Sequence, residues 1–149
     1  MTEIRLSDVD EMLANAGALF SEHWEEVALN KQVMVLKPDE QKYRTMEANG
    51  MLLILGAFCD GRVVGYSVNF VTNHPHYADL IVCNNDLLFV TEDKRCGRLG
   101  LQLIRATEKE AKQRGVQLML WHAKPGTALE QMMPRLGYGV QDTIFSIQI

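Results

Sequence analysis

The chain has 149 residues, 47% of them hydrophobic and 23% charged, and nineteen acidic against fifteen basic side chains give it a net charge of −4. This length fits one domain over residues 1–149, with a core large enough to need no disulfides or metals. The acidic balance argues against a nucleic-acid surface, and no apolar run approaches the ~18 residues of a membrane span. We see no secretory signal at the start, and the three cysteines form no CxxC pair or Cys/His cluster. We therefore expect a cytoplasmic protein without a structural metal.

The first fifty residues predict mainly helix. A short strand at residues 4–6 precedes a long helix over residues 8–28, where apolar side chains recur at helical spacing. Ser7 and Asp10 resemble a capping box at the start of this helix. A second helix is expected over residues 38–50, because acidic residues near its start suit the positive end of a helix dipole.

The middle of the chain predicts strands. Residues 51–59 form a continuous apolar run typical of a buried strand. The Asp60-Gly61 pair that follows is a strong hairpin signal, and alternation predicts an antiparallel partner as far as residue 72. After a loop at residues 73–77, residues 79–90 form a long strand with polar residues in its middle.

The last third alternates between helix and strand. A helix over residues 98–114 is followed by a strand at 116–123, a helix at 126–136 and a final strand at 138–149. The predicted order is β-α-α-β-β-β-α-β-α-β. It corresponds to an α/β fold with a mixed, mostly antiparallel sheet that carries helices on both faces.

Residues 90–104 (VTEDKRCGRLGLQLI) join the central strand to a helix through a turn that contains glycine. Such a turn leaves backbone N–H groups unpaired at the positive end of the helix, where they can bind phosphate. Lys94, Arg95 and Arg98 add positive charge. The alternative is an ordinary turn with a solvated basic cluster. A dinucleotide-binding loop would need GxGxxG, which the two glycines of this segment do not provide.

The run RCGRLG at residues 95–100 resembles the signature R/Q-x-x-G-x-G/A of the GNAT superfamily of N-acetyltransferases. It departs from the signature at Arg98, which stands where glycine is expected, while Gly97 lies one place earlier. The downstream segment 101–115 (LxLIxxxExxAKxxG) and the ending 134–147 (PRLGYGVQDTIFSI) also look like this family. The resemblance is greatest to its small members from bacteria and phages.

This resemblance implies acetyl-CoA as cosubstrate, no metal, and transfer of the acetyl group to a primary amine by direct attack. In the family the strand before the loop parts from its neighbour, and pantetheine lies in the gap. The backbone N–H of Val90 would then polarise the thioester carbonyl. The residues expected to bind the cofactor are Val90, Arg95, Cys96, Gly97, Arg98, Leu99, Gly100 and Leu101.

The proton-transfer positions of the family are filled unusually. The general base is often a Glu eleven residues before the motif, and this position is Asn84, which cannot serve as a base. Asp86 lies on the same strand face and is our candidate base, with Asn84 holding a water or the acceptor. A solvated strand carboxylate is the alternative for Asp86. The usual Tyr acid is replaced by Met133.

The family's first helix usually forms one wall of the acceptor site, so His23 and Glu26 are candidates to bind the amine. His76, in the loop before the central strand, is a third. His122 shares a strand face with apolar residues, which favours a structural core histidine. The expected partner is a small-molecule or peptide amine, with no nucleic acid and no membrane, and a homodimer is left open.

A second class of function is an acyl-CoA-binding module with little or no turnover. Asn84 and Met133 at the proton-transfer positions keep this alternative open. Convergence of Asp86 and the histidine loop on the thioester would favour the enzyme, and their separation would favour the module.

Overall fold

A computed structural model describes residues 1–149 and contains one five-stranded sheet in the order β1-β2-β3-β4-β5. The strands are β1 (Thr2–Ser7), β2 (Leu52–Cys59), β3 (Arg62–His74), β4 (Tyr77–Val90) and β5 (Leu118–Leu120). The first four pair antiparallel in sequence order, and β5 pairs parallel to β4. The expected mixed and mostly antiparallel sheet is confirmed.

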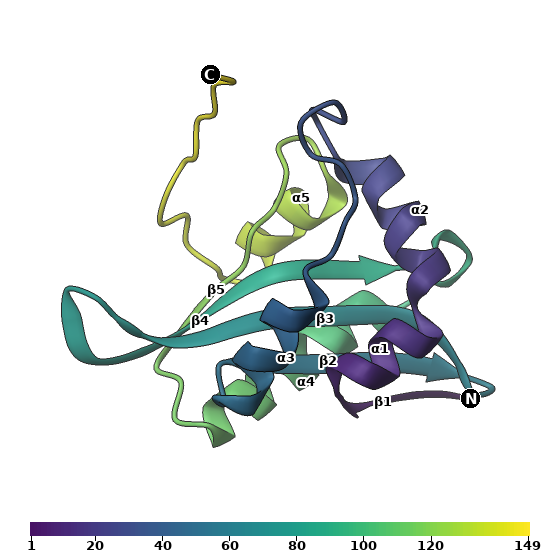
Figure 1. Cartoon of the computed structure of the whole chain (residues 1–149), viewed down its shortest axis with the longest axis horizontal. Helices are drawn as coiled ribbons and strands as arrows, with labels where there is room; N and C mark the ends of the chain where they lie inside the picture. Colours follow the sequence, from purple (N-terminus) through teal and green to yellow (C-terminus); the bar gives the residue numbers. More distant parts are fainter.

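Helices cover both faces of this sheet (Figure 1). They are α1 (Val9–Asn15), α2 (Gly17–Val27), α3 (Glu40–Ala48), α4 (Leu99–Gln113) and α5 (Ala128–Arg135), with a 3₁₀ turn η1 (Glu92–Lys94) before α4. In Figure 1, α1 and α3 lie in front of the sheet and α4 lies behind it. None of these helices has the length and apolar character of a membrane span.

The apolar run of β2 is continuous because both of its faces are buried. Leu52 and Ile54 pack with α1 residues in one core, and Leu53 and Leu55 pack with α4 residues in the other. The Asp60-Gly61 turn has φ of 51° and 78°, as a two-residue hairpin of the predicted kind requires. The central sheet thus follows directly from local sequence pattern.

The helix predicted over residues 8–28 is two helices, which is a correction. They meet at Ala16, whose φ of −113° and ψ of 7° are not helical. The Ala16 N–H donates to the Met12 carbonyl at the end of α1. The Ala16 carbonyl accepts the first hydrogen bond of α2, from the Phe20 N–H. Ala16 is fully buried at this bend, and the neighbouring Gly17 has a low helix propensity.

The strand predicted at residues 138–149 is absent, so the last element of the predicted order is wrong. The chain leaves α5 at Gly137, whose φ is +89°, and the yellow segment of Figure 1 runs away from the sheet. Its apolar side chains are exposed, Phe145 at 90% and Ile147 at 85%. Alternation marks a segment that can form a strand, but a strand needs a partner, and β5 offers an edge of only three residues.

Candidate functional site

The outer edge of β4 is open over its second half. Residues Val82–Asn84 of β4 pair with Leu118–Leu120 of β5, and the pairing ends there. Beyond it β4 continues to Val90 with only β3 beside it. The two strands therefore part, in the place where the family resemblance puts pantetheine.

The backbone of Val90 points into this gap. The N–H of Thr91 donates to the Val64 carbonyl at 2.9 Å, and Gly65 stands opposite Val90. Hydrogen-bonded and non-bonded pairs alternate along an antiparallel ladder, so the N–H and C=O of Val90 face away from β3. A Cβ on Gly65 would lie 2.8 Å from the Phe89 carbonyl oxygen, which explains why glycine stands there.

A bulge interrupts β4 in the middle. Leu87 pairs with Val68 and Asn85 with Asn69, which leaves Asp86 without a partner on β3. The buried amide of Asn85 donates to the Asn69 Oδ1 at 2.9 Å and to the Leu87 carbonyl at 3.0 Å. These bonds satisfy polar groups that the bulge removes from the regular ladder.

Asp86 projects from the bulge toward α3. The Tyr43 hydroxyl donates to its Oδ2 at 3.2 Å. Partial burial of the carboxyl group against the protein raises the pKa of Asp86. The Tyr43 hydrogen bond and the charge of His122 act to lower it. Burial, followed by the Asp86 carboxylate, raises the pKa of Tyr43 to about 12. Asp86 is thus a solvent-accessible carboxylate with a perturbed pKa, as a general base requires.

His122 is exposed, so its expected place in the core is a correction. The strand ends at Leu120, two residues earlier than the histidine, and alternation no longer applies beyond it. Its charge instead acts on Asp86 across the gap. The sequence alone does not reveal this pair, because Asp86 and His122 lie far apart in the chain.

The start of α4 fits an anion. Arg98 caps the helix without a side-chain hydrogen bond, and the first helical bond runs from the Gln102 N–H to the Arg98 carbonyl. The N–H groups before Gln102 have no partner within the helix. A Cβ on Gly97 or Gly100 would meet nothing within 4 Å, so a ligand can approach the backbone closely. Cys96, Gly97 and Arg98 are exposed, Gly100 and Leu101 half-buried, and Leu99 buried.

Arg95 turns toward α2. Its Nε donates to the Val90 carbonyl at 2.7 Å, and its two terminal nitrogens donate to the Glu26 carboxylate at 2.7 and 2.6 Å. The guanidinium carbon lies 5.2 Å from the centre of the Phe89 ring. Glu26, expected at the acceptor site, therefore binds the first residue of the motif.

The other two acceptor candidates lie apart from the gap. His23 is 7% exposed, bonds the Tyr66 hydroxyl at 2.8 Å and stacks on Phe89 at 4.7 Å. Burial lowers the pKa of His23, which makes it a neutral core residue at neutral pH. His76 sits at the tip of the β3–β4 hairpin, ten residues before Asp86 on an extended strand. The structure does not bring these histidines to Asp86.

The position of the family's usual acid is also filled by a core residue. Met133 of α5 is buried. The nearby Tyr138 hydroxyl donates to Glu108 of α4 and accepts from Arg105. No three His, Cys, Asp or Glu side chains gather as a metal site requires.

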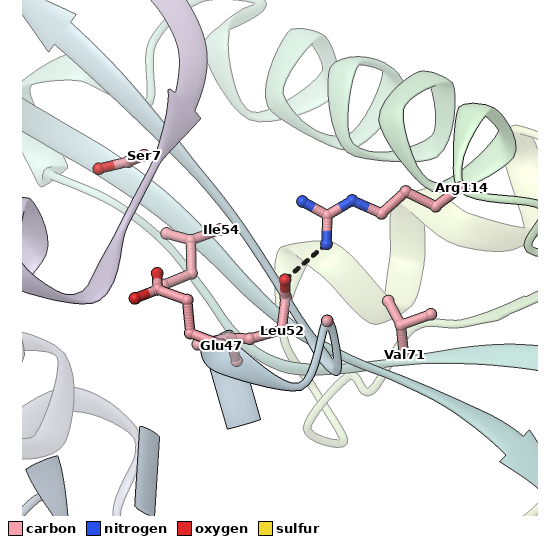
Figure 2. Close-up of a pocket in the computed structure, with 7 residues that line it drawn as sticks. Ser7, Glu47, Leu52, Ile54, Val71 and Arg114 are labelled. Carbon is pink, nitrogen blue, oxygen red and sulfur yellow. Dashed lines mark hydrogen bonds between the residues drawn. The ribbon is translucent and has the colours of Figure 1, made fainter. Parts of the chain in front are cut away.

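A depression of about 420 Å³ lies at the opposite end of the sheet, where β2 begins and α4 ends. Figure 2 shows Arg114 reaching across it to the Leu52 carbonyl, at 2.6 Å. Glu47 on its other side accepts from the N–H of Val9 and so caps α1. Both charged side chains are hydrogen-bonded to backbone groups, so we assign this depression a structural role.

The fold is that of solved acetyltransferases. The structure is similar to an aminoglycoside acetyltransferase from an uncultured soil metagenomic sample, with a TM-score of 0.78 and 14% identity over 100% of this chain and 99% of that one. It is also similar to a ribosomal-protein-alanine N-acetyltransferase from Brucella melitensis biovar Abortus 2308 (TM-score 0.73, 16% identity, 100% and 99% covered). A predicted acetyltransferase from Clostridium acetobutylicum, solved with acetyl-CoA, gives 0.70 and 12% over 99% and 96%.

These identities define a shared fold. The family follows from the sequence, because the model of the acetyltransferase (GNAT) family matches residues 18–138, and the chain belongs to this family. A comparison with curated protein sequences finds no significant match.

Proposed function

We propose that this protein transfers an acetyl group from acetyl-CoA to a primary amine of a small molecule or peptide. The observation that carries the proposal is the course of β4. The strand leaves β5, turns the Val90 N–H into the gap, and leads through the motif to a helix start with unpaired N–H groups. An N–H in the gap suits the carbonyl of a thioester, and a helix start with unpaired N–H groups suits a pyrophosphate.

The proposed cofactor site has two portions. The amides from Cys96 to Leu101 would hold the pyrophosphate, and Arg98 supplies positive charge at the same helix end. When bound, acetyl-CoA supplies an acetyl group on a thioester. The Val90 N–H is directed to donate a hydrogen bond to the thioester oxygen, where negative charge develops as the amine attacks.

Asp86 is the proposed base. It would take a proton from the amine, directly or through a water that Asn84 holds on the same face, as nitrogen bonds to the acetyl carbon and the carbon–sulfur bond breaks. The electron pair leaves on sulfur as thiolate. A thiol has a pKa of ~8.5, so this leaving group needs little help from an acid, which suits a chain with Met133 in place of tyrosine.

The test is an acetylation assay that follows release of free CoA thiol. Acetyl-CoA and a panel of primary amines, from polyamines and aminoglycosides to amino acids and lysine peptides, are incubated with the protein. At least one amine should release CoA far above the rate without amine. As part of the same proposal we place the reaction in the cytoplasm, where three free thiols stay reduced.

The second candidate function is an acyl-CoA-binding module with little or no turnover. It is favoured by the separation of His76 from Asp86 and by the buried Met133. Calorimetry distinguishes the two: CoA binding without CoA release for any amine in the panel would support the module.

A further inference from the structure

The Glu26–Arg95 pair joins α2 to the start of the motif across sixty-nine residues of sequence. The two bonds are parallel and short, at 2.7 and 2.6 Å. Such bidentate, charge-assisted bonds are stronger and more directional than ordinary ion pairs. The guanidinium also donates from Nε to the Val90 carbonyl at 2.7 Å.

This arrangement fixes the peptide unit between Val90 and Thr91 from two sides. Its carbonyl accepts from Arg95, and its N–H donates to the Val64 carbonyl at 2.9 Å. The proposed thioester donor is the N–H of the same residue, Val90. That N–H belongs to the preceding peptide unit, which shares the Val90 Cα with this one. Fixing the Val90–Thr91 peptide therefore limits rotation about the Val90 Cα–C bond and sets the course of the loop that follows.

Other contacts make α2 a firm support for the pair. Phe89 lies within 5.2 Å of the Arg95 guanidinium and stacks with His23, which is one turn before Glu26 on α2. His23 is in turn bonded to Tyr66 of β3. Figure 1 shows α2 beside the end of β4, where the chain turns back toward α4. The helix and the strand end are therefore held together at two successive turns.

We propose that Glu26 is a positioning residue that acts through Arg95, holding the Val90 peptide and the start of the cofactor loop in place for acetyl-CoA. This inference rests on the proposed function wherever it predicts a change in KM or kcat. It replaces the sequence-based expectation that Glu26 binds the amine. It also assigns the Arg95 side chain to the loop's own backbone, leaving Arg98 as the free guanidinium at the helix start.

A double-mutant cycle tests this proposal. Glu26→Gln keeps the size of the side chain and removes its charge, and Arg95→Gln removes both sets of bonds. Each should raise the KM for acetyl-CoA and lower kcat/KM about tenfold, because small displacements of the reacting geometry are costly. The KM for the amine should not change. The double variant should equal Arg95→Gln, since Glu26 has no partner left to act on.

The matched control is Glu25→Gln, which breaks the neighbouring pair with Lys31 at 2.8 Å on the same helix. It should leave both KM values unchanged. A rise in the amine KM alone in Glu26→Gln would overturn the proposal in favour of acceptor binding. Multiplying effects in the double variant, or tighter CoA binding after Glu26→Gln, would overturn it as well.

The same cycle read as CoA dissociation constants separates this inference from the proposed function. If the wild-type protein binds CoA without turnover, the proposed function fails, and about tenfold weaker CoA binding in Glu26→Gln still supports the positioning role. Unchanged binding would then overturn it. A wild-type protein that does not bind CoA overturns both.

Discussion

Asp86 is the residue at which three parts of the molecule meet: the bulge of β4, the Tyr43 hydroxyl of α3 and the charge of His122. The bulge places Asp86 and Leu87 on the same face of the sheet. Leu87 packs against the core there, while Asp86 stays exposed to solvent. A carboxylate here is supported by a hydrogen bond and close to the open edge of β4. The residue therefore combines solvent access with a perturbed pKa, two features expected of a group that transfers protons.

Replacing this carboxylate tests its role directly. Asp86→Asn keeps an acceptor for the Tyr43 hydroxyl but cannot take a proton at neutral pH. We expect kcat/KM to fall ~10²-fold or more, with CoA affinity nearly unchanged, because the phosphates would bind at the start of α4 and not at this carboxylate. Steady-state kinetics and calorimetry measure the two quantities.

Asp79→Asn, on the exposed start of the same strand, is the control for that variant and should keep wild-type rates. His76→Ala addresses the rival base on the hairpin. Near-wild-type rates in Asp86→Asn together with a loss in His76→Ala would move the base to the hairpin.

The Tyr43 hydrogen bond predicts a shift in pH dependence. This bond lowers the pKa of Asp86, so Tyr43→Phe should raise that pKa. A base acts in its ionised form, and the acidic limb of the kcat/KM profile should therefore move to higher pH. The phenyl ring keeps the packing against Phe70. Tyr77→Phe, 64% exposed at the hairpin tip, should leave the profile in place, and a shift to lower pH in Tyr43→Phe would contradict the assignment.

At the scale of elements, several predictions that depended on near neighbours in sequence were correct. The capping box was not: Asp8 caps α1 by accepting from the Glu11 N–H, and the Ser7 hydroxyl donates to the Glu11 carboxylate. The Asp60-Gly61 turn, the buried run of β2 and the glycine-containing entry to α4 each follow from residues within a few positions of one another. The pairs that shape the site are different. Tyr43 and Asp86 lie forty-three residues apart, and Glu26 and Arg95 sixty-nine, so only the tertiary fold brings them together.

Periodicity failed where an element ended or bent. The helix expected over residues 8–28 bends at Ala16. The acceptor role expected of His23 came from the family resemblance, whereas its spacing from Phe20 and Val27 places it on the apolar face of α2, beside Phe89. His122 lies just beyond the end of β5 and is exposed. The final strand was predicted without a partner edge long enough to receive it, since β5 has only three residues. A pattern indicates what a segment can form, and its neighbours decide whether it does.

The first turn of α4 provides a test at this scale. Gly100→Val adds a branched side chain where a Cβ meets nothing within 4 Å, so the protein should fold normally. Valine also favours helix more than glycine does. If the N–H groups of this turn hold pyrophosphate, the same side chain should abolish CoA binding while circular dichroism stays unchanged.

Gly139→Ala fills another open position, after α5 and away from the motif, and should bind CoA like the wild-type protein. Wild-type CoA affinity in Gly100→Val would mean that this helix start does not hold the cofactor.

At the scale of the whole molecule, charge is distributed unevenly. The protein carries a net charge of −4, yet the segment before α4 contains three basic residues. Arg95 is paired with Glu26, and Lys94 lies 3.6 Å from Asp93. Arg98 forms no ion pair and stands at the positive end of a fifteen-residue helix. The start of α4 is thus a place suited to a phosphate group on a protein of net negative charge, and that net charge limits non-specific attraction of other polyanions.

This distribution predicts which ligands stabilise the fold. A ligand that binds only the native state raises the free energy of unfolding by RT ln(1 + [L]/Kd), about 2.7 kcal/mol at a hundred times Kd. Acetyl-CoA and CoA should raise the melting temperature in a thermal shift assay. NAD and ATP should do so much less, because they carry phosphates without the pantetheine chain that the β4–β5 gap would enclose.

Pantetheine should also act weakly, because it lacks the pyrophosphate that the start of α4 would bind. The two portions of CoA are expected to act together, since one continuous segment from Val90 to Leu101 would contact both. Equal stabilisation by NAD, or none by CoA at millimolar concentration, would contradict the proposed cofactor.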